Sequence, residues 1–232
     1  MDDFLQLFSI PSTATLTTVL KRRGLNNAFM RAVQPLRADA RLAGVAFTLR
    51  YLPTREDLAG DVVDNLKDVQ RIGIERIAPG EVLVIDARGE TGAGTLGNIL
   101  ATRLQVKAAA GIVTDGAYRD SPSIAKMEIA AYAAAMNANS SKTIHHPSEI
   151  QVPIACGGVA VFPGDIVVGD GEGVVVVPRY MAEEVAREAV EQEEMETFIL
   201  EKIEAGASIV GAYPMDAATL SEFDTWKKNK NG

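Results

Sequence analysis

The segment from Gly89 to Asp120 constrains the fold of this 232-residue chain more than any other stretch. It begins with the glycine-rich loop Gly-Glu-Thr-Gly-Ala-Gly-Thr-Leu-Gly-Asn-Ile-Leu, which opens a helical run. The run leads to the strand-like sequence Gly-Ile-Val-Thr-Asp, and a turn connects this to Arg119 and Asp120. A loop that opens a helix leaves backbone N–H groups free, and such groups bind anions. The segment therefore predicts an α/β unit that handles a small acidic molecule.

The sequence on either side of this loop predicts alternating helices and strands. Ser12, Thr13 and Thr15 are candidate caps for a short helix over 12–22. Apolar spacing predicts two longer helices, over 56–72 and 95–109, and the second has Leu96, Ile99, Leu100, Leu104 and Ala108 on one side. The further elements expected before residue 130 are strands over 44–52, 81–86 and 112–115 and a short helix over 122–127.

The later chain has a different texture. Residues 150–178 are rich in valine, glycine and turn signals, which predicts several short strands in succession, closed by Pro178. An acidic helix is expected over 180–204, and the polar tail from 221 to 232 reads as frayed. Residues 1–232 are therefore expected to form one α/β domain, with a core over about 40–206 and a C-terminal helical arm over 207–232.

Composition narrows the classes of function. The 23 basic and 31 acidic residues give a net charge of −8, which argues against a nucleic-acid partner. The longest apolar runs are strand-length, and no signal peptide is evident, so we expect a cytoplasmic protein with no membrane partner. Cys156 is the one cysteine, which fits a reducing compartment, and we expect it to be a small core residue.

Three interpretations of the glycine loop remain open. The loop lets a helix pack closely on a sheet, or it binds a carboxylate at the first amides of the helix, or it binds a dinucleotide. The spacing of Gly92, Gly94 and Gly97 matches the dinucleotide fingerprint, with Asp115 as the acidic residue of the next strand. Five residues separate Asp86 from Gly92, and the later chain lacks alternating units, which both weaken the dinucleotide interpretation.

Arg119 and Asp120 also allow two interpretations. Asp120 or Ser121 could cap the helix that Pro122 begins, with Arg119 as a surface ion-pair partner. Alternatively, Asp120 binds a hard divalent cation, and Arg119 holds a substrate oxygen that becomes anionic during the reaction.

At this point the sequence resembles the RraA-like family, which includes 4-hydroxy-4-methyl-2-oxoglutarate aldolases and regulators of ribonuclease E activity. The resemblance spans roughly residues 80–206. It rests on Gly97-Asn-Ile-Leu100, Gly111-Ile-Val-Thr-Asp-Gly-Ala-Tyr-Arg-Asp120, Gly157-Gly-Val159, Pro163-Gly-Asp-Ile-Val-Val-Gly-Asp-Gly171, Gly173-Val-Val-Val-Val-Pro178 and the glutamate-rich helix. It implies a β/β/α swivelling-type domain, a homotrimer or dimer of trimers, and an active site at the subunit boundary.

The resemblance also assigns roles to residues. It places the metal-binding aspartate at Asp120, the substrate-oxygen arginine at Arg119 and the carboxylate-binding amides at Ile99 and Leu100, after Gly97. Glu196, or else Glu193, would reach the metal-bound waters of a neighbouring subunit. The aldolases carry an aspartate for proton transfer where this chain has Asn98. An amide can orient water but carries no proton at neutral pH.

The function that this pattern favours is a lyase dependent on Mg²⁺ or Mn²⁺. It would cleave a C–C bond of a small 2-oxo acid and release pyruvate, and it would also decarboxylate oxaloacetate. A Schiff-base aldolase would need a desolvated lysine, for which Lys107 and Lys126 are poor candidates. Two more functions stay open: a non-catalytic regulator that binds a ribonuclease and, least favoured, an NAD(P)-dependent oxidoreductase.

Three further residues attract attention. His145 and His146 precede Pro147 and are expected in a loop. If extended, they would point to opposite faces and make a poor chelating pair. Trp226 stands alone in the polar tail and is a candidate for docking at a subunit interface.

Overall fold

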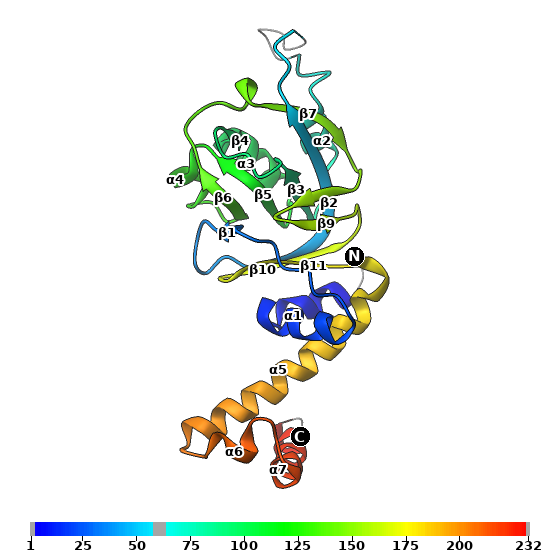
Figure 1. Ribbon diagram of the computed structural model, residues 1–232, viewed down its shortest axis with the longest axis vertical. Helices are drawn as coiled ribbons and strands as arrows, with labels where there is room; N and C mark the ends of the chain where they lie inside the picture. The colour runs from blue at the N-terminus through cyan, green and yellow to red at the C-terminus, as the bar shows by residue number, and fades with distance from the viewer. Residues whose placement is uncertain (1–2, 58–63, 231–232) are drawn as a thin grey trace.

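The computed structural model describes residues 3–57 and 64–230 as one mixed α/β domain with a near-barrel sheet and C-terminal helices (Figure 1). The main sheet has the strand order β1-β6-β5-β3-β2-β10-β11, with β4 added to β5 and β7 added to β2. The predicted α/β class with a helical arm is confirmed. The division into a core over 40–206 and an arm over 207–232 stays a prediction.

The main sheet contains the strands expected over 44–52, 81–86, 112–115 and 150–178, together with four that the sequence did not predict, β1, β4, β6 and β7. The strands of this sheet are β1 (Gln34–Pro35), β2 (Leu42–Pro53), β3 (Glu81–Asp86), β4 (Gly94–Leu96), β5 (Gly111–Tyr118), β6 (Ala130–Met136), β7 (His145–Ile150), β10 (Ile166–Asp170) and β11 (Gly173–Val177). A separate two-stranded sheet pairs β8 (Ile154–Cys156) with β9 (Val159–Val161). The predicted succession of short strands over 150–178 is therefore confirmed.

Parallel pairing occupies the centre of the sheet. Strand β3 pairs parallel with both β2 and β5, and β5 pairs parallel with β4 and β6. Strand β10 pairs antiparallel with β2 and β11. The ends of β4 and β5 therefore lie together, and the residues that follow both strands meet at one edge.

In strands such as β3 and β11, alternate apolar side chains are buried on opposite faces of the curled sheet. In β3, Val82 and Val84 face one buried cluster, whereas Leu83 and Ile85 face another. In β11, Val174 and Val176 join the same inner cluster, and Val175 and Val177 face a third. Because both faces are buried, these strands are continuous apolar runs. The inner cluster lies within the curl, and helices cover the outer two.

Two groups of helices cover the outer faces. Helices α2 (Val69–Arg76) and α3 (Asn98–Val106) lie over the β3–β5 face. The first turn η1 (Asp3–Ser9), α1 (Thr13–Arg22) and the start of α5 (Ala182–Glu204) cover β10 and β11. Ser12 caps α1 by accepting a hydrogen bond from the Thr15 amide, so one of the three candidate caps is confirmed. In Figure 1, α1 lies between the sheet and α5.

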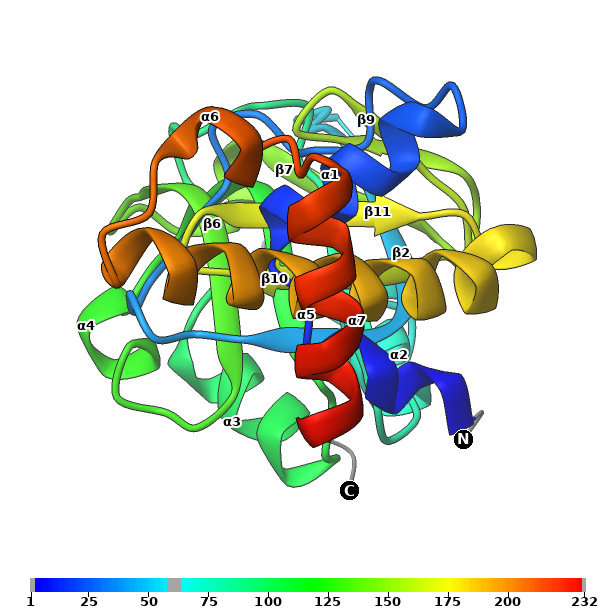
Figure 2. The ribbon, with the colours of Figure 1, turned by 90° about the horizontal axis from the view of Figure 1, so that it is seen from below.

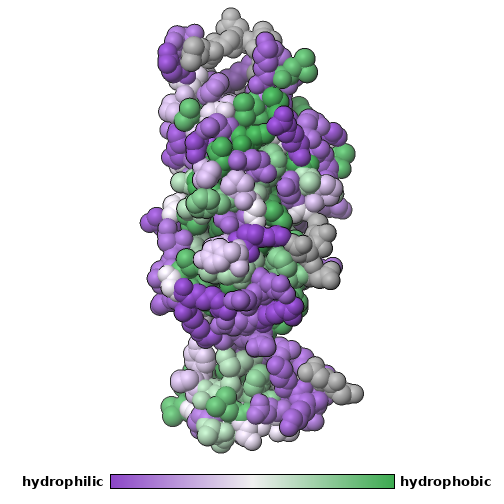
Figure 3. All heavy atoms as spheres, turned by 90° about the vertical axis from the view of Figure 1, so that its right-hand side faces the viewer, coloured by the Kyte–Doolittle hydropathy of each residue, from purple (hydrophilic) through white to green (hydrophobic). Residues whose placement is uncertain are grey.

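The distal half of α5 leaves the body and carries α6 (Ile209–Ala212) and α7 (Ala217–Lys230) (Figure 1). Seen from below, α7 crosses α5 (Figure 2). The space-filling view shows this end as a separate lobe with both apolar and polar surface (Figure 3). The expectation of a frayed tail is wrong for the described residues, because α7 continues to Lys230.

Two predicted helices differ from the structure. The helix expected over 56–72 begins only at Val69, because Asp68 caps it by accepting from the Arg71 amide. Residues 58–63, which include Leu58 and Val62 of the predicted stripe, lie outside the described residues. The helix expected over 95–109 spans only 98–106, because Gly94–Leu96 pairs with β5. The predicted apolar stripe fails at Ile99, which is 80% exposed.

The short helix expected over 122–127 is α4, which spans Ser121–Ile124. The chain also contains η2 (Ser141–Thr143) and η3 (Arg179–Met181), single turns of 3₁₀ helix. No helix in residues 3–57 and 64–230 is long and apolar enough to cross a membrane.

Candidate active site

An open cavity of about 350 Å³ lies where β4, β5 and the start of α3 meet. Gly97, Asn98, Ile99 and Leu100 line it on one side, together with Arg119 and Asp120. The opposite wall comes from the start of α2 and from residues around η2 and β7. The structure thus brings together the residues to which the resemblance assigned a role in this segment, from Gly97 to Leu100 and at Arg119 and Asp120.

Asp120 does not act as a helix cap. It occupies the N-cap position of α4, but its side chain makes no capping hydrogen bond. Its backbone has φ 55°, a left-handed conformation that aspartate tolerates better than most residues. The carboxylate is partly exposed at the cavity. The capping interpretation is therefore wrong for Asp120, and its carboxylate is left for another role.

Arg119 lies beside this carboxylate without a hydrogen bond to it. Its Nε atom is 3.8 Å from Asp120 Oδ2, which is ion-pair distance. The same Nε is buried and has no hydrogen-bond partner among the described residues. A buried guanidinium nitrogen without an acceptor is costly, so this donor suits a ligand oxygen.

Glycine is required where the loop meets these two residues. A Cβ at Gly97 would lie 2.6 Å from Asp120 Oδ2 and 3.0 Å from Arg119 Cγ. A Cβ at Gly94 would lie 2.7 Å from the Arg119 backbone nitrogen. Contacts this short leave no room for a side chain at either position. The loop glycines thus allow close packing, as the first interpretation held, and they pack the loop against the Arg119-Asp120 pair.

The first amides of α3 are available to an anion. Gly97 caps the helix with an extended backbone and has no side chain to bond them. The intrahelical ladder starts with the bond from the Ala101 amide to the Gly97 carbonyl, 3.1 Å long, so the preceding amides have no helical acceptor. The Asn98 amide is 3.4 Å from Asp120 Oδ2. Ile99 and Leu100 lie on the cavity wall with their amides at the positive end of the helix.

The charges around the cavity favour an acidic ligand. Arg71, Arg119 and Lys142 contribute positive charge, and Asp68 and Asp120 contribute negative charge. His145 also lines the cavity, and its burial lowers the pKa of the imidazole, which keeps the ring neutral. The cavity is thus locally basic although the chain is acidic overall.

Sequence reasoning missed Asp68, Gln70, Arg71, Lys142 and His145 in this wall. For the first three, the sequence offered Asp68 as a helix cap, but the prediction of a helix over 56–72 placed this residue inside the helix. The loop prediction for the two histidines is wrong, because β7 begins at His145. His145 is buried and His146 is exposed, so they lie on opposite faces of the strand.

Other candidate residues serve the fold. Asp115 accepts hydrogen bonds from the Ala87 and Gly89 amides, at 2.7 and 3.0 Å, and Asp86 accepts from the amides of Arg88 and Ala155. Both oxygens of the Asp115 carboxylate accept backbone hydrogen bonds, so it is a poor acceptor for the hydroxyls of a ribose. Cys156 is buried in the inner cluster, as expected.

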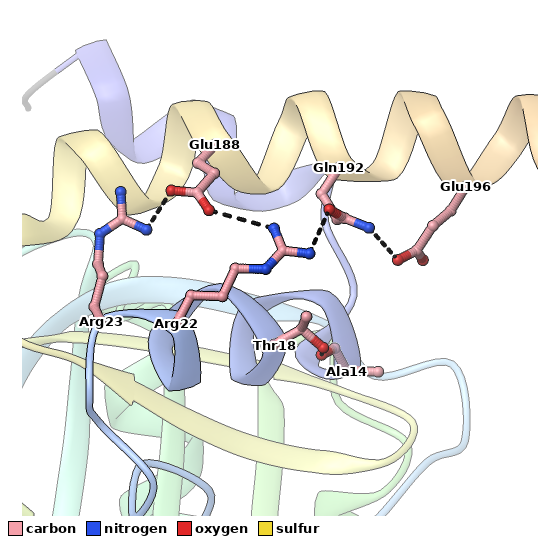
Figure 4. A network of polar contacts seen from close by, with 7 residues as sticks. All are labelled: Ala14, Thr18, Arg22, Arg23, Glu188, Gln192 and Glu196. Carbon is pink, nitrogen blue, oxygen red and sulfur yellow. Dashed lines mark hydrogen bonds and ion pairs between the residues drawn. The ribbon is translucent and has the colours of Figure 1, made fainter. Parts of the chain in front are cut away.

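The acidic helix α5 carries both candidate glutamates, and the two have different partners. Glu196 Oε1 accepts from Gln192 Nε2 at 2.8 Å, and Gln192 in turn accepts from Arg22 of α1 at 3.1 Å (Figure 4). Glu193 accepts from the Thr15 hydroxyl at 2.6 Å and from the Ser12 amide at 3.3 Å. Neither lines the cavity of its own chain. Glu193 is engaged at the start of α1, which leaves Glu196 as the better candidate for another copy.

The lysine candidates for a Schiff base do not lie at the cavity. Lys107 donates to the Glu75 carbonyl at 2.7 Å on the surface, and Lys126 is exposed. Lys142 does line the cavity, but it is exposed as well. A nucleophilic lysine needs desolvation or a neighbouring cation. None of these three lysines is desolvated.

Trp226 packs within its own chain. Its ring lies 5.7 Å from that of Phe198 and 6.0 Å from that of Phe223. Its Nε1 donates to Glu201 Oε2 at 2.8 Å. These contacts join α7 to α5, so the described structure gives Trp226 an intramolecular role.

Comparisons with known proteins give the chain its relatives. A model of the RraA-like family, described as Aldolase/RraA, matches residues 13–176. A protein of Halalkalibacterium halodurans, named as a candidate 4-hydroxy-4-methyl-2-oxoglutarate aldolase, is 30% identical over 187 residues, which are 81% of this chain and 82% of that one.

Solved structures agree with this match. Streptomyces coelicolor RraAS2, described as an unusual member of the RNase ES inhibitor RraA protein family, has a TM-score of 0.79 and 31% identity, covering 87% of this chain and 98% of that one. An uncharacterized protein of Pseudomonas syringae pv. tomato has a TM-score of 0.79 and 26% identity, covering 90% and 96%.

Proposed function

The chain belongs to the RraA-like family of Aldolase/RraA proteins, and on that premise we propose that it is a divalent-metal-dependent lyase. It cleaves a C–C bond of a 2-oxo acid and releases pyruvate, as a class II aldolase of the 4-hydroxy-4-methyl-2-oxoglutarate type. The observation that carries this proposal is the Arg119-Asp120 pair. Both side chains lie at the cavity wall, and neither is used as a cap or a hydrogen-bonded ion pair.

Binding of the 2-oxo acid begins with its carboxylate. The amides of Ile99 and Leu100 receive this group at the positive end of α3. The keto oxygen then lies toward Arg119, whose unpartnered Nε supplies a donor. When the C–C bond breaks, its electron pair moves to the pyruvate half and negative charge collects on the keto oxygen. Arg119 stabilises that charge more than it stabilises the neutral ketone, which is the condition for catalysis.

The donor set fits a hard cation. No group of three or more His, Cys, Asp or Glu side chains in the described chain could hold a metal, so a site here rests on Asp120 and water. Mg²⁺ is commonly bound by one or two carboxylates and keeps several waters. Asp120 would hold Mg²⁺ or Mn²⁺, which when bound supplies a Lewis acid for the keto group.

Glu196 enters this proposal through assembly. We place it at the site of a neighbouring copy, in a homotrimer or a dimer of trimers, where its carboxylate orients water near the cation. Among residues 3–57 and 64–230, its one hydrogen-bond partner is Gln192, which bonds to Oε1 and leaves Oε2 available. The partner classes are thus a small 2-oxo acid and further copies of the chain.

Asn98 bears on which bond the site breaks. Cleavage of a 4-hydroxy-2-oxo acid requires removal of a proton from the hydroxyl, and an amide side chain accepts no proton at neutral pH. Decarboxylation of oxaloacetate leaves the same pyruvate half without that proton transfer. Oxaloacetate is therefore the first substrate to test.

Pyruvate release from oxaloacetate tests the proposal. We expect Mg²⁺-dependent turnover that a chelator abolishes. Asp120→Ala should lower it by about a hundredfold or more, since it removes the cation's one protein ligand in the chain. Asp39→Ala, at an exposed aspartate paired with Arg37, is the matched control. Equal turnover by Asp120→Ala and the unmodified chain would disprove the proposal.

A ribonuclease regulator is the second candidate, favoured by the structural match to RraAS2. Such a role needs an interaction surface and no turnover, and an acidic protein suits a basic RNA-binding face. Its signature would be ribonuclease inhibition that survives in Asp120→Ala, with no chelator-sensitive turnover of any 2-oxo acid.

The dinucleotide interpretation predicts thermal stabilisation of the chain by NAD or NADP. We do not expect this, because the Asp115 carboxylate already accepts two backbone hydrogen bonds.

A further inference from the structure

Buried side chains, rather than another strand, hold the outer edge of β4. The Thr95 carbonyl accepts from the Tyr51 hydroxyl of β2 at 3.0 Å and from Gln70 Nε2 of α2 at 2.8 Å. Two residues earlier, the Ala93 carbonyl lies 3.3 Å from His145 Nε2 of β7. The other edge of β4 pairs with β5, and the Thr95 hydroxyl donates to the Ala117 carbonyl at 3.0 Å. Side chains and strand pairing thus fix this short strand from both edges.

The position of β4 sets the geometry of the candidate active site. Strand β4 ends at Leu96, and Gly97 then leads directly into α3. Displacement of Thr95 would therefore move the amides of Ile99 and Leu100. Gly97 packs directly against Asp120, since a Cβ at Gly97 would lie 2.6 Å from Asp120 Oδ2. A shift of the strand would consequently be felt at both the anion-binding amides and the carboxylate.

Both donors to Thr95 are chemically fixed. A carbonyl only accepts, so Gln70 must present its NH₂ group to it. Burial, with a smaller contribution from Asp68, raises the pKa of Tyr51 well above its usual value, so its hydroxyl keeps its proton. Gln70 is only 6% exposed, and it is also part of the cavity wall. Its side chain therefore joins the wall of the cavity to the backbone of β4.

We propose that Gln70, supported by Tyr51, is a positioning residue which aims the α3 amides at the carboxylate of the bound 2-oxo acid by holding the Thr95 carbonyl. This inference rests on the proposed function, since it assigns the amides that ligand. Gln70 does not take part in bond breaking. Its loss should weaken binding of the acid while the fold is retained.

Oxalate binding, measured by calorimetry with Mg²⁺ between pH 5.5 and 8, tests the proposal. Gln70→Met keeps the length of the side chain but donates nothing, so we expect at least about tenfold weaker binding than the unmodified chain at every pH. Gln70→Glu should be equally weak at pH 8, where a carboxylate faces the carbonyl. By pH 5.5 the oxalate affinity of Gln70→Glu, taken as a ratio to that of the unmodified chain at the same pH, should rise by about tenfold, because a protonated carboxyl donates again.

The controls separate positioning from other effects. Gln34→Glu makes the same chemical change at a glutamine whose Nε2 donates to the Glu172 carbonyl at 3.2 Å, on the surface. It should match the unmodified chain. The other charged or titratable side chains are Tyr51 at the Thr95 carbonyl and, at the cavity, Asp68, Arg71, Arg119, Asp120, Lys142 and His145. All are present in the unmodified chain and in both Gln70 variants, so a pH effect that they cause is the same in all three proteins.

A second readout needs neither metal nor ligand. Hydrogen exchange of the peptide spanning 94–101 should accelerate in Gln70→Met and Tyr51→Phe, with the β3 peptide unchanged. Oxalate binding that is equal in Gln70→Met and the unmodified chain would overturn the positioning role. The positioning role would also be overturned if the oxalate affinity of Gln70→Glu depended on pH in the same way as that of Gln70→Met. Failure of the unmodified chain to bind oxalate would overturn the proposed function, and with it this inference.

Discussion

Asn98 bears on which of the two proposed reactions the cavity favours. Its backbone amide lies near Asp120, and its side chain makes no hydrogen bond with the described residues. In the RraA-like aldolases that the sequence resembles, an aspartate stands at this position. Asparagine and aspartate have nearly the same size, and Asn98 is partly exposed on the cavity wall, so either residue fits there. The chemical difference is the capacity to move a proton.

Asn98→Asp should therefore change the two reactions unequally. We expect pyruvate release from a 4-hydroxy-2-oxo acid to rise by about tenfold or more in kcat, within the range of general base catalysis. Oxaloacetate decarboxylation should change by less than about threefold, since it requires no proton removal from a hydroxyl. Asn26→Asp, at an exposed asparagine, controls for the added charge. Equal changes in both reactions would contradict this role for residue 98.

His145 gives the chain an acid-sensitive contribution to stability. Burial lowers the pKa of its imidazole below the usual 6.5, so between the lowered value and 6.5 the unfolded chain binds more protons. The contribution is complete above pH 6.5 and is lost as the pH falls toward the folded-state pKa. His145→Gln, which keeps an amide donor, should show a shallower fall in urea midpoint from pH 7 to 5. His146→Gln, at an exposed ring, should keep the pH dependence of the unmodified chain. Identical pH dependence of the urea midpoint in the unmodified chain and both variants would contradict the role of His145.

At the scale of elements, the junction of β4, Gly97 and α3 explains the glycine loop. The sequence pattern alone could not separate packing from anion binding, because both require glycine before a helix. The contact distances show that the loop packs on Arg119 and Asp120, the pair to which we assign the chemistry. A glycine motif can therefore satisfy a packing requirement and shape a site at once.

Gly97→Ala tests that junction. The added methyl group would collide with Asp120 Oδ2, so we expect turnover to fall by about a hundredfold with a melting temperature lowered by only a few degrees. Gly92→Ala is the matched control in the same loop, because its Cβ would meet only the ends of the Glu90 and Ile144 side chains. Comparable losses in the two variants would show that loop flexibility, and not the contact with Asp120, is required.

The elements also show where sequence reasoning stops. Strands such as 81–86 were predictable because their apolar residues alternate between two buried faces. The start of α2 was not, because Leu66 and Val69 fit a helical period although Leu66 is 87% exposed. Periodicity reports spacing and not burial. Because the start of α2 was misplaced, Asp68, Gln70 and Arg71 were not recognised as residues of the site. His145 was not recognised because β7 is a short strand between polar turns, and its sequence has no clear strand pattern.

At the scale of the whole molecule, the site and the C-terminal lobe are built from different kinds of contact. The cavity lies on the sheet, whose strands are buried on both faces. The lobe joins the body through α5, and α7 is held to that helix by the aromatic contacts of Phe198, Phe223 and Trp226 (Figure 1). Lys202 of α5 also pairs with Glu222 of α7. The family match ends at residue 176, before this lobe begins.

Because few contacts connect α7 to the rest of the chain, the lobe should open at lower denaturant concentration than the sheet. Trp226 is the single tryptophan, so its fluorescence reports on the lobe, whereas far-ultraviolet circular dichroism reports on the whole fold. Phe198→Ala removes a buried ring between α5 and α7 and should lower the urea midpoint seen by fluorescence, leaving the main dichroism transition in place. Leu220→Ala, at a half-exposed residue of α7 outside the aromatic contacts, should move neither. If both probes shift together in Phe198→Ala, the lobe and the sheet unfold as one cooperative unit.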